Sequence, residues 1–300
     1  MPQRAAMSSD SHELEGLEHR TMSVAGLDLH VVLAGAGPPL VLLHGWPQFW
    51  WCWRELIVPL GQHHRVICPD LRGFGASAAP ASSGRLGAGF EKERLADDLL
   101  GLLDALELER VGMIGHDWGG LVGFLACLRA PQRFGGLLAL AINHPWPQVG
   151  RLPDPRAAAR LWYQAVIAAP VLGRELLRHR AVVERLLRRA GAGVWDQQAM
   201  ARYADALSGS KGSSSSVALY RSFLTRELAP LLRGRYADQR LRVRTRLLVG
   251  ERDPVLTADS VAGFEAHADD MTLEWVPGAG HFLPEECPEL VLERAGELFQ

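Results

Sequence analysis

The chain has 300 residues, of which 48% are hydrophobic and 22% are charged, so it can bury a large core in one large domain or two ordinary ones. Its formal net charge of -2 and isoelectric point near 6.6 give no electrostatic case for nucleic acid or an anionic membrane as partner. A small neutral ligand fits that balance better.

The first twenty residues are polar and carry acidic side chains where a secretory signal needs an apolar core. No later run approaches the ~18 apolar residues of a membrane span. The sequence therefore predicts a cytoplasmic protein that does not enter a membrane and whose residues 1–20 are flexible. The cysteines, at positions 52, 68, 127 and 287, show no metal or redox spacing, which predicts plain buried thiols.

Short apolar runs then alternate with stretches of helical period, a pattern typical of a mostly parallel sheet covered by helices. Residues 27–45 predict two antiparallel-type strands that turn at the Gly/Pro cluster 35–39. Buried central strands are predicted at 64–70, 110–117 and 135–143. The stretch 93–108 predicts a sheet-covering helix, because its leucines at 95, 99, 102, 103 and 106 share one face.

From about Pro147 to Gly234 the patterns are only helical, with breaks predicted at Pro170, at residues 191–193 and at a serine-rich loop, 208–216. Strands resume at 244–250 and 271–280, and a helix over 287–299 closes the chain. The sequence thus predicts a helical cap, residues 148–236, inserted into an α/β core formed by residues 1–147 and 237–300.

The stretch GHDWGG, residues 115–120, lies between a predicted strand and a predicted helix. A nucleophile flanked by glycines two residues away on each side is typical of the nucleophile elbow, where the usual occupant is serine. Here the occupant is Asp117, and the competing interpretation is a turn former or helix cap.

Trp46, Asp253 and His281 also fall just after predicted strands, where open α/β sheets bind their ligands. Nucleophile, acid and histidine follow the chain order of the α/β-hydrolase triad. A simple turn is the alternative for Asp253, and most of the 11 histidines must be structural or surface residues. We expect His44 and His116 to be structural, and Asp70 to pair with Arg72.

Five motifs together resemble the epoxide hydrolase family of the α/β-hydrolase fold: HGWP 44–47, DLRGFGAS 70–77, GHDWGG 115–120, GERDPV 250–255 and GAGHF 278–282. Within the predicted cap, WYQAVIAAPVLG 162–173 and ALYRSFLTREL 218–228 resemble the two segments that carry that family's cap tyrosines. The resemblance places these tyrosines at Tyr163 and Tyr220, whereas plain helix packing suits Tyr203 and Tyr236.

The resemblance implies an α/β-hydrolase fold and hydrolysis of a small epoxide to a vicinal diol, with no cofactor and no metal. A carboxylate nucleophile suits this reaction, because serine would form an ether that water does not cleave, whereas Asp117 forms an ester. Tyr163 and Tyr220 then assist the departing oxygen, and His281, oriented by Asp253, activates water. The implied oxyanion donors are the backbone N–H groups of Trp46 and Trp118, and the implied substrate contacts are Trp118 and Phe282.

Three alternatives remain open. A haloalkane dehalogenase shares the Asp-His-acid set, but a departing halide leaves two cap tyrosines unexplained, and that family commonly has Asn at the position of Trp46. A fluoroacetate-type dehalogenase is expected to have Arg at the position of Trp118. A hydrolase fold used as a ligand-binding module with little turnover is the third. The sequence leaves open which epoxide and enantiomer are used, and the oligomeric state.

Overall fold

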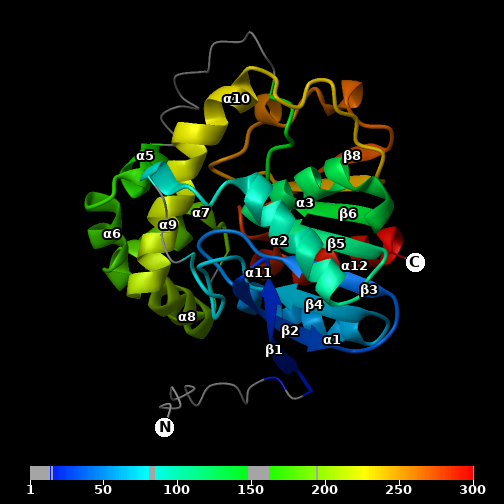
Figure 1. The fold of residues 1–300 in the computed structure, drawn as a ribbon, viewed down its shortest axis with the longest axis horizontal. Coiled ribbons are helices and arrows are strands. Elements are labelled where there is room, and N and C mark those ends of the chain that lie inside the picture. The colour runs from blue at the N-terminus through cyan, green and yellow to red at the C-terminus, as the bar shows by residue number, and fades with distance from the viewer. Residues whose placement is uncertain (1–13, 15, 81–84, 148–161, 194, 300) are drawn as a thin grey trace.

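The computed structural model describes residues 14, 16–80, 85–147, 162–193 and 195–299, whose strands form one eight-stranded sheet (Figure 1). The strand order is β1-β2-β4-β3-β5-β6-β7-β8. Strand β2 pairs antiparallel with β1 and β4, and every other pairing is parallel, which confirms the predicted mostly parallel sheet. The strands are β1 Glu18–Val24, β2 Leu27–Ala34, β3 Pro39–Leu43, β4 Arg65–Pro69, β5 Val111–His116, β6 Phe134–Leu140, β7 Thr245–Gly250 and β8 Met271–Val276.

Two predictions about the start of the chain need correction. Strand β1 begins at Glu18, inside the stretch 1–20 predicted to be flexible, whereas residues 1–13 and 15 lie outside the described residues. The run 27–45 forms β2 and β3 as predicted, but the two are not paired, because β4 lies between them. Strand β3 is an uninterrupted apolar run, which suits a central position between parallel neighbours rather than a hairpin.

Helices cover both faces of this sheet. Helix α2 packs against α3 on one face, and α1 packs against α12 on the other. Helix α2 matches the helix predicted at 93–108, and the five leucines expected on its inner face are all buried, which confirms that prediction. These core helices are α1 Arg54–Gly61, α2 Lys92–Ala105, α3 Trp118–Arg129, α11 Leu283–Glu286 and α12 Pro288–Leu298.

Between β6 and β7, the described residues from 162 to 232 are mostly helical, and their helices gather at one side of the sheet (Figure 1). The predicted breaks at Pro170 and at residues 191–193 are confirmed. Residues 148–161 lie outside the described part, so the cap boundaries stay a prediction. The helices are α5 Trp162–Ala168, α6 Leu172–Leu177, α7 Arg180–Ala190, α8 Gln197–Ser208, α9 Ser210–Ser222 and α10 Leu228–Leu232, and a π-helical turn, Phe223–Glu227, joins the last two.

The prediction that the serine-rich stretch 208–216 forms a loop is wrong, because most of this stretch forms helix α9. Two of its buried serine hydroxyls bond to carbonyls one turn earlier: Ser213 donates to the Gly209 carbonyl at 2.9 Å and Ser216 to the Gly212 carbonyl at 2.7 Å. Ser216 also accepts a hydrogen bond from the Trp46 indole at 2.9 Å, which ties α9 to the core. Tertiary burial here outweighs the weak helix preference of serine.

All four cysteines are free thiols, three of them buried. Burial raises the pKa of the Cys127 thiol above its usual range, so this side chain behaves as a small apolar group. Among the described residues, no helix is long and apolar enough to cross a bilayer. The same residues hold no group of three or more His, Cys, Asp or Glu side chains that could bind a metal ion.

Candidate active site

Asp117 stands at the turn between β5 and α3, with φ 49° and ψ -124°. Its carboxylate makes no capping hydrogen bond to α3, so the helix-cap alternative is wrong. The two nearby glycines permit this tight turn. A Cβ added at Gly119 meets the Leu43 carbonyl oxygen at 2.1 Å, and one added at Gly115 meets the Gly119 carbonyl oxygen at 2.6 Å.

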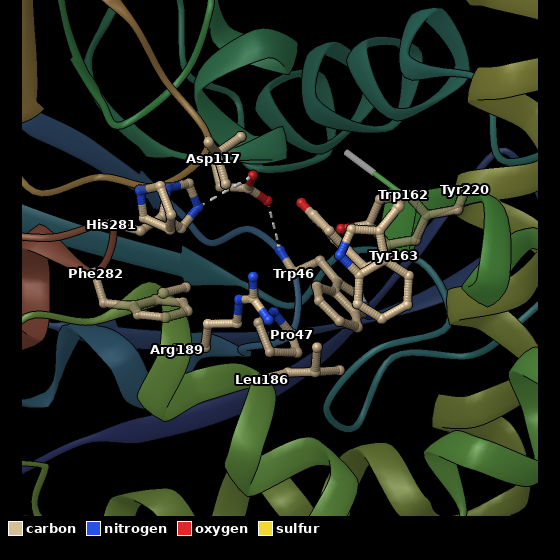
Figure 2. A pocket seen from close by; sticks show the side chains of 13 residues that line it. Trp46, Pro47, Asp117, Trp162, Tyr163, Leu186, Arg189, Tyr220, His281 and Phe282 are labelled. Carbon is tan, nitrogen blue, oxygen red and sulfur yellow. Dashed lines mark hydrogen bonds and ion pairs between the residues drawn. The ribbon is translucent and has the colours of Figure 1, made fainter. Parts of the chain in front are cut away.

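His281 lies between two carboxylates. Its Nδ1 is 2.7 Å from Asp253 Oδ2. Its Nε2 is 3.5 Å from Asp117 Oδ2 (Figure 2). Asp253 also accepts backbone N–H bonds from Val255 at 2.7 Å and Leu256 at 3.2 Å, which hold its carboxylate in place. The three side chains come from the ends of β5, β7 and β8, and the fold brings them together as the sequence order predicted.

The charges of this group depend on one another. Burial alone disfavours the charged imidazole, but the carboxylates of Asp253 and Asp117 raise the pKa of His281 to about 10. Burial also opposes ionisation of Asp253, yet His281 and the N–H donors hold the pKa of that carboxyl below its usual value. Burial and the charge of His281 lower the pKa of His116 to about 4. His116 is therefore neutral, and its Nε2 bonds the His281 carbonyl at 2.8 Å, the structural role expected of it.

The second oxygen of Asp117 faces a backbone donor. The Trp46 N–H donates to Asp117 Oδ1 at 2.8 Å (Figure 2). Trp118 is the first residue of α3, and the first N–H groups of a helix have no acceptor within it. The two N–H groups expected to form an oxyanion hole thus belong to residues beside the carboxylate.

Tyr163 on α5 and Tyr220 on α9 line the same cavity as Asp117. Their ring centroids are 6.0 Å apart, and Trp46 contacts both rings. In Figure 2 the two tyrosines lie across Asp117 from His281. Burial raises the pKa of Tyr163 to about 12 and that of Tyr220 well above its usual value, so both phenols are protonated at neutral pH.

The cavity, including its open mouth, has an empty volume of about 690 Å³. Phe282 is part of its wall, as expected, but the Trp118 side chain is not, so the predicted substrate contact of that indole is not supported. Tyr203 and Tyr236 lie elsewhere and donate to Glu285 and Glu93. The wall residues that sequence reasoning missed are Pro47, Trp162, Leu186, Arg189, Ala190, Pro254 and Val255.

Trp162 and Pro254 adjoin predicted site residues, so their positions could have been inferred from the sequence. The α7 residues carried no such signal, because their place in the wall depends on how α7 docks.

One expected pair near the site is wrong. Arg72 bonds Asp98 at 2.6 Å rather than Asp70, because Asp98 faces it from α2. Asp70 instead accepts the backbone N–H groups of Trp50 at 2.8 Å and Ala76 at 2.9 Å. Asp70 therefore holds its loop through backbone donors, which a count of opposite charges in the sequence does not reveal.

Comparison with known proteins adds independent findings. A family model for the alpha/beta hydrolase fold matches residues 38–288. The soluble epoxide hydrolase of Corynebacterium sp. (strain C12) is 30% identical over 302 residues, which cover 94% of this chain and 97% of that protein. Epoxide hydrolase 2 of Siraitia grosvenorii is 38% identical over 131 residues, covering 43% of this chain and 40% of that protein.

The solved structure of epoxide hydrolase CorEH without ligand is 28% identical to this chain, with a TM-score of 0.84. The match covers 94% of this chain and 98% of that structure, so the similarity includes both the core and the cap.

Proposed function

The chain belongs to the epoxide hydrolase family of the α/β-hydrolase fold, and from that premise we propose that it converts an epoxide and water into a vicinal diol. One observation carries the proposal: the carboxylate of Asp117 faces His281 on one side and two protonated phenols on the other. A nucleophile, a base and two acids are the groups that this reaction requires.

The first step is ring opening. Asp117 Oδ2 attacks an epoxide carbon, the carbon–oxygen bond breaks, and an ester links the substrate to the enzyme. Tyr163 and Tyr220 donate hydrogen bonds to the departing oxygen, and one of the phenols gives it a proton, so that an alcohol and a phenolate are formed. Burial keeps both phenols protonated, as donors must be.

The second step is ester hydrolysis. His281 takes a proton from water, which attacks the carbonyl carbon of Asp117. Negative charge then collects on Oδ1, the oxygen that already accepts the Trp46 N–H. A preorganised donor of this kind typically contributes about 3 kcal/mol to the transition state. When the intermediate collapses, the bond to the substrate oxygen breaks and that oxygen takes the remaining proton of the attacking water, which releases the diol and restores the carboxylate.

The electrostatics of the site support this order of steps. While Asp117 is ionised, its charge and that of Asp253 hold His281 in the protonated form. Ester formation removes the charge of Asp117, so the pKa of His281 falls, its proton can return to the phenolate, and the neutral imidazole can act as a base. Ester formation thus produces the neutral imidazole that ester hydrolysis requires.

A substrate panel tests the proposed function. Purified protein is incubated with matched epoxides and haloalkanes of the same carbon skeleton, and diol and halide are both measured. We expect diol from epoxides and little halide, because a halide ion needs no proton donor. Halide release without diol formation favours a dehalogenase, and binding without either product favours a ligand-binding protein.

A further inference from the structure

Lys92 is the first residue of α2, and it is 1% exposed although it carries an ammonium group. The chain has 32 basic residues, of which only Lys92 and Lys211 are lysines. A buried ammonium is costly unless it is paired and hydrogen-bonded. Its position under the active site therefore needs a physical account.

The partners of Lys92 belong to the cap. Its Nζ donates to Glu227 Oε1 at 3.1 Å and to the Leu219 carbonyl at 3.2 Å. Glu227 also accepts the Lys92 backbone N–H at 2.8 Å and the Ser222 hydroxyl at 2.9 Å. Glu227 lies at the end of the π-helical turn, a distortion often found at functional sites. The pair thus fixes the cap at Leu219, the residue before Tyr220.

The same ammonium lies over an aromatic ring. Lys92 Nζ is 4.4 Å from the ring centroid of Trp118, the residue after the nucleophile, and 5.3 Å from that of Phe223. Trp118 in turn contacts the ring of Tyr220, with 5.8 Å between centroids. A cation over an indole face draws electron density from the ring, which makes the indole N–H a stronger donor.

The Trp118 indole lies against the ring of Tyr220. Trp118 Nε1 is buried and has no hydrogen-bond partner of full geometry among the described residues. Burial raises the pKa of Tyr220, and the Trp118 N–H opposes that rise, as a donor near the phenol oxygen does. A chain of contacts therefore runs from Lys92 through the Trp118 ring to the ring of Tyr220.

We propose that Lys92 is a positioning residue for ring opening, whose charge acts through Trp118 and the Leu219 carbonyl so that Tyr220 stabilises the departing alkoxide. This inference rests on the proposed function. If Lys92 only holds the cap against the core, the same contacts are expected. In that case the effect of its substitution on ring opening does not depend on the basicity of the departing oxygen. That dependence is therefore the property to measure.

The experiment follows one turnover with enzyme in excess over substrate. Loss of epoxide reports ring opening, and appearance of diol reports ester hydrolysis. The substrates are 1,2-epoxypropane and its trifluoromethyl analogue, which yields a much less basic alkoxide when the terminal carbon is attacked. The variant is Lys92→Met. Its matched control is Lys211→Met, because Lys211 also joins α9 to the core, through the Gly75 and Ser77 carbonyls at 2.8 Å each.

We expect Lys92→Met to slow opening of 1,2-epoxypropane roughly 10- to 30-fold, the effect of losing a desolvated cation–π contact. For the fluorinated epoxide we expect ring opening to slow only about 3-fold or less, because its less basic alkoxide needs less stabilisation by Tyr220. The rate of ester hydrolysis should change little, because Tyr220 does not take part in that step. Lys211→Met leaves both substrates nearly unaffected. An equal loss on the two epoxides, or the same loss in Lys211→Met, overturns the inference.

Lys92→Met leaves Glu227 as a partly buried charge without its partner, which can prevent folding. The double variant Lys92→Met/Glu227→Gln removes both charges and keeps donors and acceptors at position 227, and it must show the same substrate-dependent loss. A folded double variant without that loss overturns the inference. If wild-type protein opens neither epoxide, the proposed function fails first, and the inference fails with it.

Discussion

Asp117 has a backbone conformation that costs a side-chain-bearing residue about 1–3 kcal/mol, with φ 49°. In this conformation the carboxylate makes no hydrogen bond to the N-terminus of α3, where an aspartate otherwise caps the helix. The oxygens are left facing Trp46 and His281 instead. A residue that sequence statistics assign to capping is thereby made available for attack.

The nucleophile can be identified by isotope. If Asp117 forms an ester that water cleaves at the carbonyl, one turnover in oxygen-18 water with excess enzyme leaves label in the Asp117 carboxylate. The diol stays largely unlabelled, because its new oxygen comes from the enzyme. Mass spectrometry of the peptide containing Asp117 measures this. Asp117→Ala is expected to be inactive, and label entering the diol directly contradicts the covalent route.

His281 is assigned to water activation, so its loss should separate the two steps. We expect His281→Gln to open the epoxide once and then stall, because the ester forms but no base activates water. Intact-protein mass spectrometry should show the chain heavier by one substrate. A variant that binds substrate without forming this adduct means that His281 is misassigned or is also needed for ring opening.

The pKa of His281 also links the site to stability. The folded value of about 10 lies above the usual 6.5, so folding favours the protonated form. That stabilisation is complete below about pH 6.5 and is lost as the pH rises toward about 10. We expect the free energy of unfolding, measured by urea titration, to fall over this range. The fall is shallower in Asp253→Asn, and equal slopes in both proteins contradict the assignment.

At the scale of elements, the cap contributes one tyrosine from each of two helices, α5 and α9. An alkoxide is a far stronger base than a halide, so its departure depends on these phenols. Tyr163→Phe or Tyr220→Phe alone should slow ester formation roughly 10²–10⁴-fold, and the double variant should be nearly inactive. Ester hydrolysis should change little. Rapid-quench measurement of epoxide and diol separates the two rates.

Tyr236→Phe is the matched control for these variants, because its hydroxyl donates to Glu93 outside the cavity. Its activity should equal that of wild type. Wild-type protein that releases halide but opens no epoxide, with an unimpaired double Phe variant, favours the dehalogenase over the epoxide hydrolase.

The close packing of α3 against the end of β3 fixes the position of the turn that carries Asp117. A Cβ at Gly119 meets the Leu43 carbonyl oxygen at 2.1 Å, so Gly119→Ala must separate the two elements. We expect it to lower the free energy of unfolding by about 1–3 kcal/mol or more, and to reduce ester formation. Gly296→Ala is the control: nothing lies near its added Cβ in α12, and it should stabilise by about 0.5–1 kcal/mol. Thermal and urea unfolding measure both.

Over the whole molecule, the sequence was informative where a local pattern and a chemical requirement coincide. Asp117 and Asp253 each follow a buried strand and His281 follows the edge strand β8, so their meeting at the carboxyl ends of parallel strands could be predicted. Helix α9 could not, because serine favours helices only weakly and here depends on burial against the core. The placement of β4 between β2 and β3 was also missed, since periodicity reveals a strand but not its neighbour.

The indole rings around the nucleophile have a spectroscopic consequence. Trp46 and Trp118 are nearly buried beside Asp117, two of nine tryptophans in the chain. Each turnover removes a negative charge next to both rings when the ester forms and returns it when the ester is cleaved. Emission from these two fluorophores should therefore change and recover in step with the covalent intermediate, so that the protein reports its own reaction cycle without an added dye.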